Sequence, residues 1–194
     1  KKVKETVTEK VKGSSKMPER TGLDKQMDDD KQAWGLEGHS YLENYIKQNL
    51  IDDKGYALAN PTDKEVRSNL NSEMKKALKD FAIELVRSYD DRPGTRFLVE
   101  VKMVNEKVSG MIASTIDFKV ISPDAKTGIK VDTYDWKFTS IDKNRTEDIP
   151  WFKRGEWKQQ MGEYTQMDYS YGIKPNQIGK ARMIPFVMNY EYAI

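Results

Sequence analysis

The spacing of apolar residues changes once along this chain, between two predicted helices and a series of predicted strands. Residues 32–50, and a longer stretch that opens at Thr62, have apolar side chains at helical spacings of three and four. From Arg96 onward, short runs rich in valine, isoleucine and aromatic residues are typical of strands. This change of period predicts an α/β fold (an α+β mixed sheet) in which helices cover a sheet.

The elements predicted after Arg96 complete the order α-α-β-β-β-α-β. They are strands at 96–104, 108–121 and 129–139, a helix at 156–170 and a strand at 180–190. The sequence shows no internal repeat. This order predicts a mixed sheet with helices on both of its faces.

The first 31 residues differ in composition from the rest. Lysines alternate there with acidic residues around Gly13-Ser14-Ser15. We expect 1–31 to be a charged arm or linker and 32–194 to be a single domain. The acidic run at 28–30 suits the start of the first helix, and the capping box Thr62-Asp63-Lys64-Glu65 predicts the start of the second helix.

Composition limits the classes of function. Charged residues make up 33% of the chain but its net charge is only +2, so a nucleic-acid site would have to be a local cleft. The absence of cysteine excludes disulfides, thiol catalysis and cysteine metal sites, which leaves oxygen and imidazole ligands. No glycine-rich phosphate loop or nucleophile motif points to a metabolic enzyme.

Carboxylates and one lysine come together on two neighbouring predicted strands. Asp117 lies in the second strand, and Asp135 and Lys137 lie on one face of the third. Two acids and an amine at the edge of a sheet suffice to hold a divalent metal and a water for hydrolysis of a phosphodiester. The alternative is a pair of solvent-facing ion pairs, because acid-x-lysine triplets recur throughout this charged chain.

Further residues stand near these segments in the predicted fold. His39, the only histidine, shares a helix face with Leu42, which suits either a metal ligand or a hydrogen-bonded core residue. Glu100 is either a third acid of the site or a solvent-side residue of its strand. Gln160 and Tyr164 are one turn apart on the last helix, as functional residues or as part of an ordinary amphipathic face.

The ordered set His39, Asp117, Asp135-x-Lys137 and Gln160-x-x-x-Tyr164 resembles the PD-(D/E)XK nuclease superfamily, specifically its RecB-like exonuclease branch. The α-β-β-β-α-β core of that family matches the order predicted here over roughly residues 34–190. There are two departures from the family pattern. Ile116, not proline, precedes Asp117, and the nearest preceding glycine is Gly110, seven positions away instead of two or three.

The resemblance implies a metal-dependent deoxyribonuclease that acts on DNA ends or single strands. It assigns Mg²⁺ or Mn²⁺ to His39, Asp117, Asp135 and the main-chain carbonyl of Trp136. It gives Lys137 the role of orienting the attacking water and stabilising developing charge. Gln160 and Tyr164 would position DNA or brace the lysine.

Cations and aromatic residues alternate in the predicted loop and helix start between Ser140 and Lys158. This composition suits a flexible single strand, through phosphate attraction and base stacking. The alternative is a solvated loop whose aromatic side chains pack into the core. The residues predicted to contact nucleic acid are Arg145, Lys153, Arg154, Trp157 and Lys158.

Two other functions remain open on the sequence. Viral cap-snatching endonucleases use a similar histidine, aspartate and acid-x-lysine arrangement on RNA, although they lack the Gln160 and Tyr164 pair. A non-catalytic nucleic-acid-binding or structural module of a larger assembly is the other, because the chain begins at Lys1 instead of methionine.

No signal peptide and no apolar run of about 20 residues is visible. We therefore expect a cytoplasmic protein with no membrane partner. The composition, the start at Lys1 and the family resemblance suit a protein of a phage or mobile element, which would lie in the host cytoplasm if viral.

Overall fold

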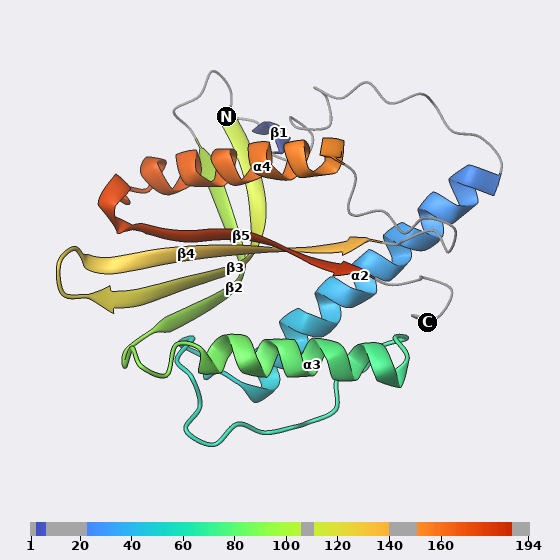
Figure 1. Cartoon of the computed structure of the whole chain (residues 1–194), viewed down its shortest axis with the longest axis horizontal. Helices are drawn as coiled ribbons and strands as arrows, with labels where there is room; N and C mark the ends of the chain where they lie inside the picture. The colour runs from blue at the N-terminus through green and yellow to red at the C-terminus, as the bar shows by residue number, and fades with distance from the viewer. Residues whose placement is uncertain (1–2, 7–22, 106–110, 140–150, 188–194) are drawn as a thin grey trace.

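The computed structural model describes residues 3–6, 23–105, 111–139 and 151–187. Apart from an added first strand, its elements follow the predicted order (Figure 1). They are β1 (Val3–Thr6), α2 (Leu23–Asn49), α3 (Ser72–Arg87), β2 (Arg96–Asn105), β3 (Met111–Asp124), β4 (Gly128–Thr139), α4 (Trp151–Ser170), the 3₁₀ turn η1 (Pro175–Gln177) and β5 (Ile178–Val187).

Within the described residues, the five strands form one mixed sheet with β3 at its centre. Strand β2 runs antiparallel along one edge of β3. The other edge of β3 pairs with β4 in its C-terminal half, antiparallel, and with β1 in its first residues, parallel. Strand β5 lies parallel to β4, and α4 supplies the crossover that a parallel connection requires. The predicted mixed sheet is therefore confirmed.

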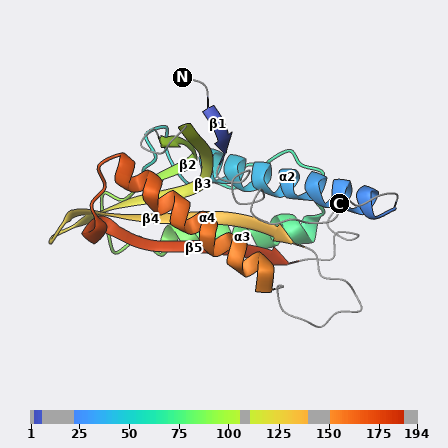
Figure 2. The same ribbon diagram turned by 90° about the horizontal axis from the view of Figure 1, so that it is seen from above.

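The helices lie on both faces of this sheet (Figures 1 and 2). The larger apolar cluster lies between the sheet and helices α2 and α3, and Trp34, Phe118 and Trp136 are among its buried members. A smaller cluster lies under α4, around Ile116 and Tyr164. Alternation along β4 places every second side chain in the larger cluster and leaves the others for the α4 side.

The predicted start of the second helix is wrong. Helix α3 begins at Ser72, and its N-cap is Asn71, whose side chain accepts a hydrogen bond from the Met74 N–H at 2.8 Å. The expected capping residue Thr62 instead donates its hydroxyl to Asn49 Oδ1 at 2.8 Å. The Lys64 N–H also donates to Asn49 Oδ1, at 2.6 Å. The segment that resembles a capping box is therefore hydrogen-bonded to Asn49, at the C-terminal end of α2.

Part of the predicted arm has regular structure. Helix α2 begins at Leu23, nine residues before the predicted boundary, because residues 23–31 contain no glycine or proline and include the good helix formers leucine, lysine, glutamine and methionine. Residues 3–6 form β1. Gly110, the nearest glycine before Asp117, lies outside the described residues. Among the described helices, none is long and apolar enough to cross a membrane.

Candidate metal centre

The candidate site lies where strands β3 and β4 separate. Their ladder ends at the pair Phe118 and Tyr134, and the next residues of the two strands are Asp117 and Asp135. At this fork the backbone N–H of Trp136 donates to Asp117 Oδ2 at 2.7 Å. The Asp117 carboxylate thus accepts a hydrogen bond that a backbone carbonyl of β3 would accept in a continued ladder. This hydrogen bond holds the Asp117 side chain at the end of the ladder.

On the other edge of β3, Glu100 of strand β2 lies opposite Asp117. The ladder between β2 and β3 pairs Val99 with Phe118 and Val101 with Ile116, and it skips Glu100. The first pair packs on the α2 and α3 side, whereas the second packs on the α4 side. Residues two apart share a face in a regular strand, so β2 reverses its faces at Glu100.

The backbone of Glu100 is strained. Its φ is 54°, and among the described residues it is the only one other than glycine with a positive φ. Such conformations cost about 1–3 kcal/mol and occur preferentially at functional sites. Residue Glu100 is half-buried, and burial followed by the charges of Asp117 and Glu43 raises the pKa of its carboxyl. The strained backbone and the neighbouring carboxylates make Glu100 a candidate member of the site.

Helix α2 brings His39 to the fork. Its Nδ1 lies 3.1 Å from Asp117 Oδ1, and its ring contacts the edge of Phe138 with centroids 5.1 Å apart. The preceding residue is Gly38, where an added Cβ would lie only 2.3 Å from the Phe138 ring. The helix can approach β4 this closely because position 38 has no side chain.

The imidazole and two carboxylates form a group that could hold a metal ion. One ligand atom from each of His39, Glu100 and Asp117 lies within 4.8 Å of the others. Ligands of Mg²⁺ are about 2.1 Å from the ion, so opposite ligands are about 4.2 Å apart and small side-chain shifts would close the shell. Carboxylate oxygens suit Mg²⁺ or Mn²⁺, and the imidazole nitrogen favours Mn²⁺. The residues therefore fit the predicted cation.

The hydrogen bond between His39 and Asp117 shifts the pKa of both side chains. Burial lowers the pKa of His39, but the hydrogen bond and charge of Asp117 outweigh it, so the pKa is raised overall. Burial opposes ionisation of Asp117, and the His39 hydrogen bond and charge nonetheless hold its pKa below the ordinary value. The His39 imidazole and the Asp117 carboxylate thus each favour the charged form of the other.

Asp135 and Lys137 form the next part of the site. The Lys137 ammonium lies 2.7 Å from Asp135 Oδ2, and its side chain is 25% exposed whereas that of Asp135 is 5% exposed. The charge of Asp117 also acts on the Asp135 carboxyl. Burial and the Asp117 charge together outweigh the effect of Lys137 and raise the pKa of Asp135 to about 7. Asp135 therefore lies beside the three-residue group, directly past the last ladder pair of β3 and β4.

Helix α4 contacts this acid from the other side. Tyr164 OH lies 3.4 Å from Asp135 Oδ1, and Gln160 Nε2 donates to the same hydroxyl at 2.8 Å. Both side chains are buried. Through this hydroxyl the two side chains brace the acid, and the acid in turn holds the Lys137 ammonium.

The fork thus gathers His39, Asp117, Asp135, Lys137, Gln160 and Tyr164, all of them predicted from the sequence. The Trp136 contact at the fork is its N–H, and its side chain is buried beside Phe81 and Phe118. Glu100, left undecided by the sequence, belongs to the group. The signal for it was an acid between valines in the middle of an apolar strand.

The described residues among those predicted to contact nucleic acid lie on α4. Helix α4 begins at Trp151, five residues earlier than predicted, so Arg154 lies on the helix together with Trp157 and Lys158, which the prediction already placed there. Arg154 and Lys158 are exposed, and Trp157 is half-buried one turn before Gln160. Arg145 lies outside the described residues, as does the side chain of Lys153.

Comparisons with protein-family models, with curated proteins and with solved structures found no match. The family resemblance therefore depends on the motif order and on the geometry of the fork.

Proposed function

We propose that this chain is a metal-dependent nuclease that hydrolyses phosphodiester bonds of DNA, at ends or in single strands. One observation carries the proposal. A group that could hold a cation, formed by His39, Glu100 and Asp117, lies beside the acid–amine pair of Asp135 and Lys137, and the N–H of the intervening Trp136 donates to Asp117 Oδ2 at 2.7 Å. Structural ion pairs alone do not require a strained acid, a histidine and a lysine at one fork of a sheet.

His39, Glu100 and Asp117 would hold Mg²⁺ or Mn²⁺, with Asp135 completing the shell from the neighbouring strand. The bound cation would polarise the phosphate and lower the pKa of a water. Burial, and after it the charge of Asp117, raises the pKa of Glu100 and Asp135, and an ion held among these acids would favour their charged forms.

In this proposal Lys137 stabilises the negative charge that develops in the transition state. Its ammonium is held by Asp135 but remains partly exposed, so it retains donors for a water or a phosphate oxygen. A fixed positive charge at this position stabilises the negative charge of the phosphorane-like transition state. Gln160 and Tyr164 are positioning residues that keep the Asp135 carboxylate in one orientation.

The proposal is tested by incubating labelled single-stranded and duplex DNA with the protein and Mn²⁺. Cleavage should occur, and EDTA should stop it. The variant Lys137→Ala should lose cleavage by a factor of about 10²–10³, the cost of removing one charge-stabilising donor, and should still fold. Lys126→Ala, which alters an exposed lysine in the β3–β4 turn, is the control and should cleave normally.

Normal cleavage by Lys137→Ala would show that the active site is elsewhere. Matched RNA oligonucleotides in the same assay distinguish a deoxyribonuclease from the RNA endonuclease that the motifs also permit. DNA binding without Mn²⁺ binding in calorimetry would instead favour the non-catalytic module.

A further inference from the structure

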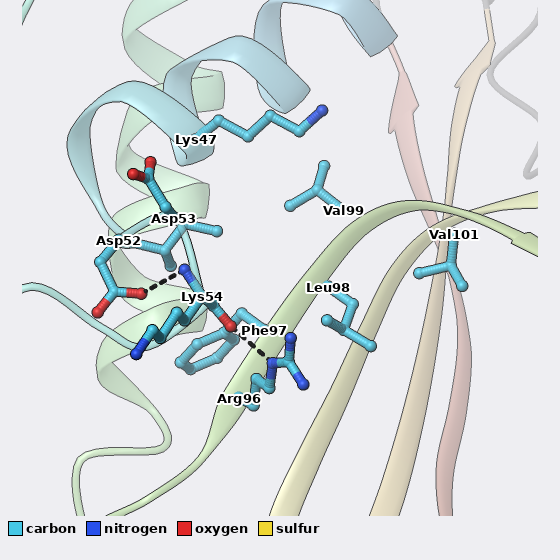
Figure 3. A pocket seen from close by; sticks show the side chains of 11 residues that line it. Lys47, Asp52, Asp53, Lys54, Arg96, Phe97, Leu98, Val99 and Val101 are labelled. Atoms are coloured by element: carbon cyan, nitrogen blue, oxygen red, sulfur yellow. Dashed lines mark hydrogen bonds between the residues drawn. The ribbon is translucent and has the colours of Figure 1, made fainter.

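A hollow lies beside the candidate metal centre, along strand β2 (Figure 3). It has a volume of about 420 Å³, and its walls are Lys47, the loop 51–55 and residues of β2 between 96 and 101. Within the described residues, β2 has β3 as its only partner strand, so it is an edge strand of the sheet. The hollow is distinct from the fork that holds Asp117 and Asp135.

The hollow opens next to the candidate cation ligands. Val99 and Val101 both line it, and they flank Glu100 on either side. Lys47 also lines it, and its charge acts on the Glu100 carboxyl. A chain bound along the hollow would therefore reach the metal centre at Glu100.

Charged and apolar side chains share the walls of the hollow. Lys47 and Arg96 lie on either side of an apolar strip formed by Leu98 and Val99 (Figure 3). The Arg96 guanidinium is held in place because its Nε donates to the Lys54 carbonyl at 2.6 Å. Asp52 lies on the turn, where its carboxylate accepts from the backbone N–H groups of residues 54 and 56 at 2.9 and 3.0 Å.

We propose that this hollow binds a single-stranded DNA segment next to the scissile phosphate. Arg96 and Lys47 would contact its phosphates, and Leu98 and Val99 would lie against its sugars and bases. The inference rests on the proposed function and adds the path of the substrate. Cavities of about 300–1,000 Å³ take drug-sized ligands, so the hollow suits one or two nucleotides of a single strand and not a duplex.

A peptide strand added to the edge of β2 fits this place less well. Such binding needs free backbone groups along the edge. The Phe97 N–H already donates to the Gly55 carbonyl at 2.7 Å, and Tyr56 forms a bridge with Arg96. The loop 51–55 thus blocks the start of the edge. Lys47 would have to exchange its ion pair with Glu43 for a phosphate, whereas Arg96 uses only its Nε on the Lys54 carbonyl and can offer its other guanidinium N–H groups to an anionic chain.

The test is fluorescence anisotropy of a labelled single-stranded DNA oligonucleotide, with Ca²⁺ in place of Mn²⁺ to prevent cleavage, at several salt concentrations. Arg96→Gln should weaken binding roughly tenfold, as expected for a charge-assisted hydrogen bond, and Lys47→Gln roughly threefold, as expected for an exposed ion pair. Each variant should reduce the slope of log affinity against log salt by about 0.7 for every phosphate that it no longer neutralises.

Two control variants match these changes. Arg87→Gln removes an exposed arginine at the end of α3. Lys76→Gln breaks an i,i+4 pair with Asp80 on α3, as Lys47→Gln breaks one with Glu43 on α2. Both controls should bind the oligonucleotide with the parent affinity and salt slope.

Parent-like affinity and salt slope in Arg96→Gln and Lys47→Gln would overturn the inference, as would a parent protein that does not bind the oligonucleotide. Cleavage of bis(p-nitrophenyl) phosphate by the parent with Mn²⁺ tests the proposed function separately, because so small a diester does not need the hollow. Cleavage of this diester together with unchanged binding by the two variants would remove the DNA path and leave the nuclease assignment standing.

Discussion

At the scale of single residues, Glu100 holds a backbone conformation that its residue type disfavours. A glycine would adopt a φ of 54° without steric cost, whereas the side chain of Glu100 contributes a carboxylate to the group with His39 and Asp117. Folding stability thus favours glycine at this position, whereas the proposed metal site requires the glutamate carboxylate.

Two substitutions of Glu100 test the backbone strain and the metal binding separately. Glu100→Gly should be more stable than Glu100→Ala by about 1 kcal/mol, because only alanine retains the left-handed strain. Both variants should bind Mn²⁺ at least about tenfold more weakly than the parent, since both lack the ligand. Urea unfolding and calorimetry measure the two effects. Equal Mn²⁺ affinity in parent and variants would remove Glu100 from the site.

Gly38 provides a second test at this scale. Gly38→Ala places a methyl group against the Phe138 ring, which should cost about 1–3 kcal/mol by overpacking and displace His39 from Asp117. Gly162→Ala on α4 is the matched control, because nothing lies within 4 Å of its added Cβ, and it should stabilise the protein by about 0.5–1 kcal/mol. Denaturant unfolding with Mn²⁺ titration measures both. A Gly38→Ala variant with parent stability and Mn²⁺ affinity would contradict this packing account.

The sequence predicted most of the site residues but not their arrangement. His39, Asp117 and Asp135 were identifiable because acids in apolar strands and a histidine on an apolar helix face are unusual. The hydrogen bond from Trp136 N–H to Asp117 and the φ of Glu100 depend on how β2, β3 and β4 separate. That separation is a tertiary feature with no local signal.

At the scale of elements, the period of the apolar residues predicted the strands and the helix order well. The start of α3 was wrong because Thr62 and Lys64 find partners on Asn49, at the end of another helix. Capping boxes are local patterns, and a long-range partner overrode this one. Strand β1 was missed because four residues in a highly charged segment carry no clear alternation.

A buried ion pair joins β3 to α4 beneath the site. Lys119 Nζ lies 2.6 Å from Asp168 Oδ1 and donates to Thr133 Oγ1 at 2.8 Å, and the side chains of the pair are 6% and 4% exposed. Burial lowers the pKa of Lys119 and raises that of Asp168, and the charge of each partner opposes the effect of burial on the other. The pair sets the position of the helix that carries Gln160 and Tyr164.

Breaking this pair should cost more than replacing it. Lys119→Met leaves a buried carboxylate without its partner and should destabilise the fold by about 3–5 kcal/mol, whereas Lys119→Met/Asp168→Leu should recover most of that loss. Urea unfolding of the parent, both single variants and the double variant gives the coupling energy. Additive effects of the two changes would show that the pair does not couple strand and helix.

At the scale of the whole molecule, the cation should stabilise the fold, because its ligands come from α2, β2 and β3. At 100 times the dissociation constant, Mn²⁺ should raise the melting temperature by about 5–10 °C in a chain of this size. Asp117→Asn should abolish the increase. Asp124→Asn, on the same strand but in the turn with Thr127, should keep it. Differential scanning calorimetry measures the shift, and an equal increase in both variants would place the cation elsewhere.

Anomalous diffraction from a crystal soaked in Mn²⁺ tests the central claim most directly. We expect one anomalous peak bounded by His39, Glu100 and Asp117, with the Lys137 ammonium nearby. A fully soaked crystal with no peak among these side chains, or with its strongest peak remote from the fork, would contradict the metal centre and the nuclease proposal built on it.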